Sequence, residues 1–238
     1  MGARALESIA AGGVAIVFGA SGGIGAALLA ALKDAGRFDT VHGFSRQSAI
    51  PIDITDEASI AGAVSEAAES GEVRFVIDAT GFLHGQGMAP EKTWRALDAD
   101  QLAHAFAVNT IGPALLMKHM LPKLPRAGKA VFATLSARVG SIEDNRLGGW
   151  YSYRASKAAL NQIVRTAAIE LSRRAPEALC VALHPGTVAT PLSDSFAKTG
   201  LDVLTPAQSA QHLLSVIDQL GTDATGGFFD WRGDQVPW

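Results

Sequence analysis

Short apolar runs of strand length alternate with longer helical patterns along the chain, and this alternation constrains the fold more than any other feature. Apolar strands separated by helices are typical of a parallel sheet that is covered by helices on both faces. The sequence therefore predicts an α/β fold built on a doubly wound parallel sheet. In such a sheet, ligands bind at the carboxyl ends of the strands, where the strand order reverses.

The expected elements follow directly from these patterns. Strands are expected roughly at Gly13–Phe18, Thr40–Phe44, Val73–Asp78, Ala130–Leu135, Leu179–His184 and Gly227–Phe229. Helices are expected roughly at Gly23–Gly36, Asp56–Ser70, Asp100–Leu124, Tyr151–Arg174 and Pro206–Leu220.

No Pro-, Gly- or Ser-rich stretch and no block of charge divides the 238 residues, so a single domain over residues 1–238 is expected. The hydrophobic fraction of 48% and charged fraction of 18% predict a folded chain with a buried core. With a net charge of -3 and scattered Lys and Arg residues, a nucleic-acid partner is not expected.

Cysteine usage and hydropathy favour a cytoplasmic protein without a membrane partner. The single cysteine, Cys180, cannot form an internal disulfide, which suits a reducing compartment. No apolar run approaches the length of a membrane span, and the first dozen residues lack a continuous apolar core of the signal-peptide kind. The six histidines show no metal-ligand spacing, so no metal site is expected.

A glycine-rich turn joins the first expected strand to the first expected helix. Glycine lets the backbone turn sharply and approach a pyrophosphate, and the helix N-terminus offers free N–H groups and partial positive charge. A purely structural turn is the alternative, but the placement favours nucleotide binding. The candidate contacts are Gly19, Ser21, Gly22, Gly23, Ile24 and Gly25.

The second expected strand is followed by Ser45 and Arg46, and no acidic residue lies between Thr40 and Ala49. An acid at this position binds the ribose of NAD, whereas a basic residue accepts the extra phosphate of NADP. A hydroxyl beside a guanidinium can hold that phosphate by charge-assisted hydrogen bonds. The sequence thus favours NADP over NAD, with Arg46 as a solvated loop charge being the alternative.

Tyr153 and Lys157 are four residues apart in a strongly helical stretch, so both side chains project from one helix face. Hydride transfer to a carbonyl creates an alkoxide that must be protonated by a nearby acid, and tyrosine can serve. A lysine at ~4 Å, with an effective dielectric of ~20, would lower the tyrosine pKa by about three units. Tyr151 lies on a different face. An ordinary helix-face pair is the alternative.

Asn109 is unusual because a helix interior disfavours asparagine and because Pro113 follows at i+4. Proline has no N–H to donate to the carbonyl of Asn109. We therefore expect a kink and a free carbonyl acceptor at this point of the helix. A packing kink with a solvated Asn109 side chain is the alternative.

The glycines Gly19, Gly23 and Gly25 follow the spacing G-x-x-x-G-x-G, and Tyr153 with Lys157 follows Y-x-x-x-K. In this order, and over nearly its whole length, the chain resembles the short-chain dehydrogenase/reductase family. The resemblance implies a Rossmann-type fold and an NADP(H)-dependent oxidoreductase of small carbonyl or alcohol substrates. It also implies that Tyr153 is the acid/base and that Lys157 lowers its pKa.

The resemblance implies further contacts with the cofactor. Asp53 would bind the adenine amino group, although it could equally cap the helix that begins near Asp56. The carbonyl of Asn109 would hold a water that links Lys157 to solvent. Other cofactor contacts implied along the chain are Ile54, Gly81 in a segment that departs from the family's N-N-A-G, and Pro185, Gly186, Val188 and Thr190 in the loop His184–Thr190.

The family's serine that orients the substrate oxygen is the weakest match. The segment Leu135–Gly140 resembles S-S-x-x-G, in which the second serine usually acts, and that position is Ala137 here. Ser136 is the first candidate, after a local backbone adjustment, and Ser141 is the second. Absence of this serine is the third possibility.

Three segments resemble the C-factor-like branch of the family more narrowly: Ala137–Ile142, Tyr151–Lys157 and Phe229–Trp231. The family implies a homodimer or homotetramer that associates through the helix carrying the catalytic pair. A loop through Ser193, Phe196 and Lys198 is expected to close over the substrate. The competing function is an NADP(H)-binding signalling or sensor protein on the same scaffold with little or no turnover.

Overall fold

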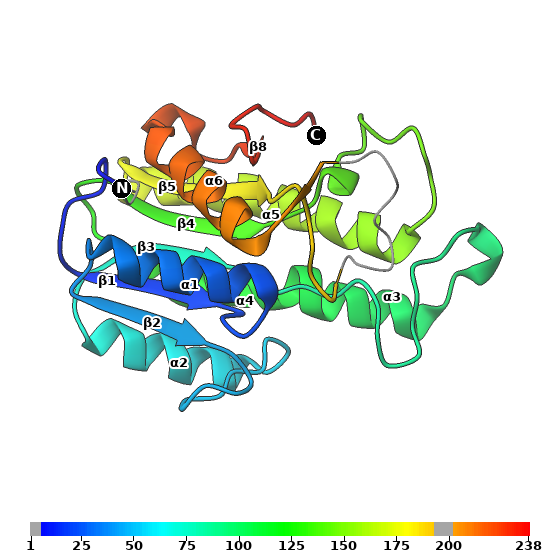
Figure 1. Ribbon diagram of the computed structural model, residues 1–238, viewed down its shortest axis with the longest axis horizontal. Coiled ribbons are helices and arrows are strands. Elements are labelled where there is room, and N and C mark those ends of the chain that lie inside the picture. Colours follow the sequence, from blue (N-terminus) through cyan, green and yellow to red (C-terminus); the bar gives the residue numbers. More distant parts are fainter. Residues whose placement is uncertain (1–5, 193–201) are drawn as a thin grey trace.

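A computed structural model describes residues 6–192 and 202–238 of the chain. Within these residues a six-stranded sheet has the order β2-β1-β3-β4-β5-β8, and all neighbouring strands are parallel. The prediction of a doubly wound parallel sheet is confirmed (Figure 1). The strands are β1 (Val14–Phe18), β2 (Thr40–Phe44), β3 (Val73–Asp78), β4 (Ala130–Leu135), β5 (Ala178–His184) and β8 (Phe228–Asp230).

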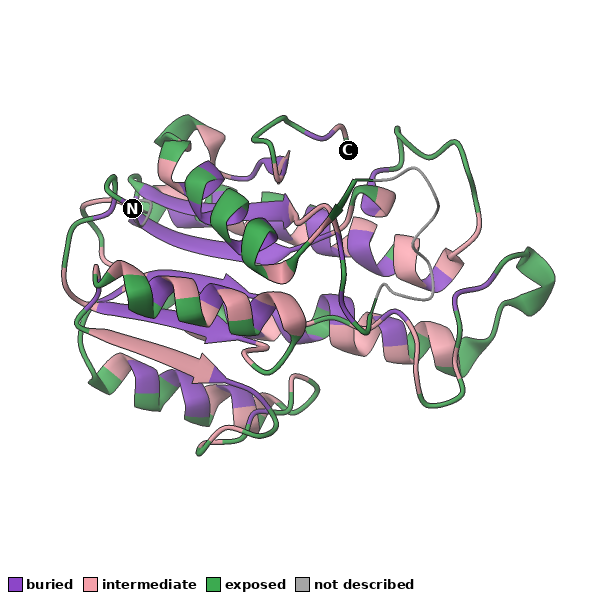
Figure 2. Ribbon diagram, in the orientation of Figure 1, coloured by how far each residue is buried: buried purple, intermediate pink, exposed green. Residues whose placement is uncertain are grey.

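Helices cover both faces of the sheet. One face is packed by α1 (Gly23–Ala35) and α6 (Pro206–Gln219), and the other by α2 (Glu57–Glu69), α4 (Gly112–Met120) and α5 (Tyr151–Arg174). The inner strands are therefore buried on both sides, whereas the edge strand β2 is only partly buried (Figure 2). This double burial explains why the strands read as continuous apolar runs.

The start of α2 settles one alternative left by the sequence. Asp56 is the N-cap of this helix, and its carboxylate accepts the N–H of Ala58 at 3.0 Å. Asp53 instead accepts the N–H and the hydroxyl of Thr55, at 2.9 and 2.7 Å. The alternative that Asp53 caps the helix is wrong, because a residue directly before the first turn already fills that role.

The expected helix at 100–124 is divided. It consists of α3 (Ala99–Phe106), a π-helical turn (Ala107–Ile111), α4 and a 3₁₀ turn (Leu121–Lys123). The N–H of Gly112 donates to the carbonyl of Ala107, five residues earlier, so the irregularity at Asn109 is a π-turn. The side chain of Asn109 is fully buried, so the alternative of a solvated Asn109 is wrong.

Several short elements escaped the sequence patterns because two or three residues carry no readable periodicity. The strands β6 (Thr187–Val188) and β7 (Val203–Leu204) pair in parallel, away from the main sheet. No helix within residues 6–192 and 202–238 is both long and apolar enough to cross a membrane. In the described part of the chain the remaining 3₁₀ turns are Trp94–Ala96, Arg138–Gly140 and Thr222–Ala224.

Candidate active site

The glycine turn lies at the point where the strand order reverses, since β1 has β2 on one side and β3 on the other. Gly19 has a φ of +78°, a left-handed conformation that favours glycine. A Cβ on Gly19 would lie 2.8 Å from the carbonyl carbon and oxygen of Ala79, just after β3. The N–H groups of Gly19 and Ala20 donate to the Phe44 carbonyl at 2.9 and 3.0 Å. The turn is thus held between the ends of β2 and β3.

The N-terminus of α1 fits an anion. Its N-cap, Gly22, has no side chain to bond the first N–H groups, and both Ser21 and Gly22 are exposed. A Cβ on Gly25 would collide with the carbonyl oxygen of Gly19, so helix and turn approach each other as closely as glycine allows. Ile24 is half-buried and packs against the core. An uncapped helix start beside a glycine turn offers free N–H groups and partial positive charge, which suit an anion such as a pyrophosphate.

The loop after β5 lies against this turn. A Cβ on Gly23 would lie 2.7 Å from Cγ2 of Thr190, which places Thr190 beside the glycines. The carbonyl of Pro185 accepts the hydroxyl of Ser209 at 2.8 Å. Gly186 has a φ of +84° and packs against Trp231 and Leu204, while Val188 is buried in β6. The structure thus brings the predicted loop residues to the predicted turn.

At the end of β2, Ser45 is buried and Arg46 is exposed. The hydrogen bonds from Thr55 hold the pKa of Asp53 below its usual value, and the charge of Arg46 lowers it further. Arg46 and Asp53 therefore share one rim of the site. Ile54 packs beside Gly112 at the start of α4, where a Cβ on Gly112 would collide with it.

The predicted reacting residues also meet. Gly81 follows β3, and a Cβ there would lie 3.6 Å from Oδ1 of Asn109 and 3.8 Å from Nζ of Lys157. Asn109 Oδ1 accepts the N–H of Phe82 at 2.7 Å. Its Nδ2 donates to the Phe82 carbonyl at 2.8 Å and to Oγ of Ser156 at 3.1 Å. The π-turn thereby ties the loop after β3 to α5.

The electrostatics of Tyr153 differ from the expectation. Burial raises the pKa of Tyr153 to about 12, whereas the sequence predicted that Lys157 lowers it. Nζ of Lys157 lies 6.0 Å from the centre of the Tyr153 ring and donates to the Leu135 carbonyl at 2.7 Å. Burial lowers the pKa of Lys157 to about 8, and the nearby carboxylate of Asp78 opposes this effect. The ammonium is directed to a carbonyl instead of to the phenol.

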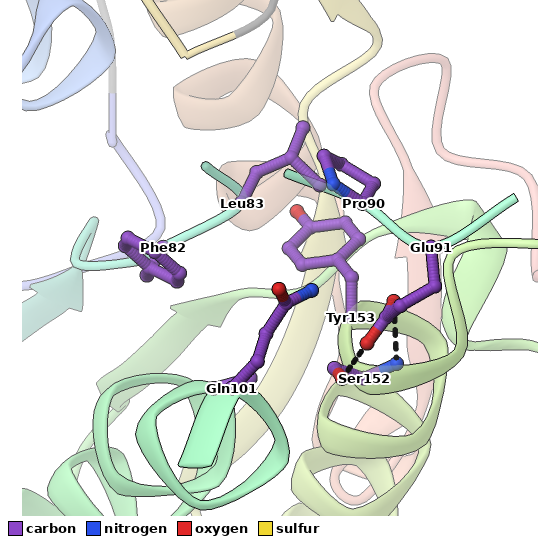
Figure 3. A pocket seen from close by; sticks show the side chains of 8 residues that line it. Phe82, Leu83, Pro90, Glu91, Gln101, Ser152 and Tyr153 are labelled. Atoms are coloured by element: carbon purple, nitrogen blue, oxygen red, sulfur yellow. Dashed lines mark hydrogen bonds between the residues drawn. The ribbon is translucent and has the colours of Figure 1, made fainter. Parts of the chain in front are cut away.

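Tyr153 lines a small cavity between the loop after β3 and the helices α3 and α5 (Figure 3). In Figure 3 its hydroxyl points between Leu83 and Pro90, away from the body of α5. The other lining residues are Phe82, Glu91, Gln101, Ala105 and Ser152.

Both serine candidates are buried and engaged. The Ser136 hydroxyl donates to Oδ1 of Asn161 on α5 at 2.6 Å. The Ser141 hydroxyl donates to the Trp238 carbonyl at 3.3 Å and accepts the N–H of Asp144 at 3.0 Å. Either serine must give up a bond before it can bind a substrate oxygen. The expected lid residues Ser193, Phe196 and Lys198 lie outside the described part of the chain.

Two acidic residues near the site were not identified from the sequence. Asp78 is fully buried at the end of β3, where it accepts the hydroxyls of Thr80 at 2.6 Å and Thr134 at 2.8 Å. Burial raises the pKa of Asp78, and these hydrogen bonds oppose that rise. Glu91 is 3% exposed and bonds the start of α5. Asp78 begins the segment that departs from N-N-A-G, which is the sequence signal that could have identified it, whereas no sequence signal marks Glu91.

Comparison with known proteins decides the family. A family model described as enoyl-(acyl carrier protein) reductase matches residues 2–219, which include both the glycine turn and the Tyr153–Lys157 pair. The chain belongs to the short-chain dehydrogenase/reductase family. The family prediction is confirmed, and this short-chain dehydrogenase/reductase is an enzyme of the oxidoreductase class.

Three relatives of this short-chain dehydrogenase/reductase are informative. C-signal of Myxococcus xanthus is 39% identical over 150 residues, which are 61% of this chain and 85% of that protein. The 1-hydroxy-2-glutathionyl-2-methyl-3-butene dehydrogenase of Rhodococcus sp. (strain AD45) is 33% identical over 187 residues, 79% of this chain and 78% of that protein. A carbonyl reductase from chicken fatty liver, solved with NADPH bound, is 25% identical with a TM-score of 0.82 and covers 97% and 99% of the two chains.

Proposed function

We propose that this protein is an NADP(H)-dependent oxidoreductase that transfers a hydride between the nicotinamide and a small carbonyl or alcohol substrate. The observation that carries the proposal is the meeting of Tyr153, Lys157, Asn109 and Gly81 beside the glycine turn at the switch point of the sheet. The NADPH-bound carbonyl reductase that shares this fold supports the same reaction class and cofactor.

The residues of the site fit NADP. The uncapped start of α1 and the glycine turn would hold the pyrophosphate, and Ser45 with Arg46 would hold the additional phosphate. Asp53 and Ile54 would lie at the adenine, and the loop Pro185–Thr190 at the nicotinamide. When bound, the cofactor supplies or accepts the hydride.

Tyr153 would be the residue that donates the proton to the substrate oxygen or accepts it. With a pKa of about 12 its phenol is neutral near pH 7, so it can donate a proton to the oxygen of a carbonyl as that oxygen gains charge. The protonated phenol is the form of Tyr153 that carbonyl reduction needs. For oxidation, the Lys157 ammonium would have to leave the Leu135 carbonyl and approach the phenol, which would lower its pKa. The carbonyl of Asn109, which Pro113 cannot bond, would hold the water that connects Lys157 to solvent.

For the oxygen-orienting group, we propose Ser136 ahead of Ser141, provided that its bond to Asn161 opens. We further propose a cytoplasmic, single-domain enzyme that associates as a homodimer or homotetramer through α5. The face Ala158, Ala159, Ile163 and Ala167 would contribute to that contact, although Ile163 and Ala167 also pack against the core. Light scattering tests the oligomeric state.

The direct test of the function is NADPH consumption with a panel of aldehydes and ketones. Turnover on at least one carbonyl class is the expected result. Tight NADPH binding without consumption on any substrate would favour the sensor alternative. The absorbance of NADPH reports the reaction, and quenching of its fluorescence reports binding.

Replacing Arg46 should change cofactor preference. In Arg46→Ala, the KM for NADPH is expected to rise about 10–100-fold, since a charge-assisted hydrogen bond contributes about 1.5–3 kcal/mol. The KM for NADH should change by less than about threefold, because NADH lacks the extra phosphate. Arg126→Ala is the matched control, because Arg126 is exposed in the loop before β4, at the amino ends of the strands and away from the carboxyl ends that carry the site. An equal rise for both cofactors would contradict the assignment of Arg46.

The rate of reduction should fall at alkaline pH. Lys157 has a pKa of about 8 and is charged below that pH, so its contribution is present at pH 7 and is lost as the pH rises through 8. The kcat/KM for NADPH reports ionisations of the free enzyme, and we expect it to be halved near pH 8. Lys157→Arg should remove this inflection, because arginine stays charged. An unchanged inflection in Lys157→Arg would assign the ionisation to another group.

A further inference from the structure

The backbone that leads into α5 is left-handed at three consecutive residues. The φ angles are +62° at Gly148, +66° at Gly149 and +55° at Trp150. Trp150 is the N-cap of α5, and its side chain makes no capping hydrogen bond. A residue other than glycine rarely adopts a positive φ, so this conformation of Trp150 must be held by contacts from elsewhere in the fold.

Glu91, in the loop after β3, supplies part of these contacts, while the Arg154 side chain donates to the carbonyls of Gly148 and Gly149. The main-chain carbonyl of Glu91 accepts the N–H of Trp150 at 2.5 Å. Its carboxylate accepts the N–H of Ser152 at 3.2 Å and also accepts the Ser152 hydroxyl. A carboxylate at a helix N-terminus compensates both the free N–H groups and the positive end of the helix dipole. One residue from a distant segment therefore fixes the first turn of α5 at two points.

Tyr153 lies in this first turn, directly after Ser152. The rings of Trp150 and Tyr153 meet edge to face with their centres 6.2 Å apart. Figure 3 shows the Glu91 carboxylate turned toward Ser152, while the Tyr153 hydroxyl points toward Leu83 and Pro90. Glu91 thus contacts the backbone that carries the tyrosine, and not the phenol oxygen.

We propose that Glu91 is a positioning residue for Tyr153. By holding the left-handed entry and the first turn of α5, it sets where the phenol lies relative to the substrate oxygen. This inference rests on the proposed function, in which Tyr153 is the proton donor. It assigns a role to a buried acid that neither the glycine turn nor the Y-x-x-x-K pattern includes.

The length of the side chain should matter more than its charge. Glu91→Gln keeps an oxygen within reach of the Ser152 N–H, whereas Glu91→Asp keeps the charge and shortens the reach by about 1.5 Å. We expect kcat for carbonyl reduction to fall at least about tenfold in Glu91→Asp, since a misplacement of ~1 Å can cost 10²-fold. In Glu91→Gln it should stay within about threefold. The Kd for NADPH should be unchanged in both, and Glu66→Ala on the exposed side of α2 is the control.

A titration reports the position of the tyrosine independently of catalysis. The chain has only two tyrosines, so Tyr151→Phe leaves Tyr153 as the single phenol. In that background Tyr153 should ionise little between pH 9 and 11, because its pKa is about 12. Adding Glu91→Asp should expose the ring and move the phenolate absorbance toward the ordinary pKa of about 10.

Two results would overturn the proposal: a Glu91→Asp enzyme with wild-type kcat and titration, or a Glu91→Gln enzyme as impaired as Glu91→Asp. Circular dichroism shows whether each variant is folded. If Tyr153→Phe were fully active, the proposed function itself would fail, yet the titration would still show whether Glu91 positions the ring. The two failures are therefore distinguishable.

Discussion

A Tyr153→Phe enzyme is expected to reduce carbonyl substrates about 10²–10⁴ times more slowly than the wild type, because a positioned general acid contributes about that factor. The phenylalanine ring fills the same space between Leu83 and Pro90, so the cavity and the fold should persist. The proposed NADPH site at the glycine turn is formed by other elements, so the affinity for NADPH should be unchanged. Steady-state kinetics and fluorescence titration with NADPH measure the two quantities.

Tyr151→Phe provides a matched control, since it removes the other phenol from the same helix turn. It should retain kcat within about twofold, because the side chain projects from a different face of α5. Equal losses in the two variants would indicate a general perturbation of α5. Full activity of Tyr153→Phe would remove Tyr153 from the mechanism.

The second large effect is expected at Gly25. A Cβ at this position would collide with the carbonyl oxygen of Gly19, so in Gly25→Ala either the turn or the start of α1 must move. Overpacking of this kind typically costs about 1–3 kcal/mol. Because the displaced N–H groups are those that would bind the pyrophosphate, we expect the Kd for NADPH to rise at least about tenfold, together with a lower melting temperature.

Gly62→Ala is the control for a glycine that nothing constrains. Gly62 lies inside α2 and is exposed, and apart from its chain neighbours and the backbone of its own helix no atom lies within 4 Å of the position of a Cβ. Alanine is favoured over glycine in a helix interior by about 1 kcal/mol, so this variant should be more stable than the wild type and bind NADPH equally well. Unchanged NADPH affinity in Gly25→Ala would contradict the close approach of helix and turn.

Much of the fold could be predicted from periodicity because most elements are long and pack on one core. The bounds of α5, β2, β3 and β4 agree with the predicted ranges, β1 and β5 differ by one residue at one end, and β8 is shifted by one residue at both ends. Periodicity did not predict the irregular local structure. The pattern at Asn109 and Pro113 indicated an interruption, but whether a helix kinks or widens into a π-turn depends on what packs beside it.

The parts of the candidate site whose geometry follows from a motif could be predicted. The contacts that depend on the direction of a side chain could not. The glycine turn, Thr190, Asn109 and Lys157 lie near the partners expected for them. The rise in the Tyr153 pKa by burial could not be predicted, because the four-residue spacing does not say which acceptor the Lys157 ammonium bonds. Glu91 bonds the start of α5 from a loop that is distant in the sequence, so no local spacing could reveal this contact.

The side-chain amide of Asn109 bonds the backbone of Phe82 in the way that the backbone of a neighbouring strand would. Oδ1 accepts the N–H of Phe82, and Nδ2 donates to the carbonyl of the same residue. The amide thus pairs its acceptor with the donor of Phe82 and its donor with the acceptor. An isosteric aspartate has no N–H to donate, so its second oxygen would face the Phe82 carbonyl without a hydrogen bond. The contact between the loop after β3 and α5 therefore depends on an amide at position 109, and not merely on a side chain of that size.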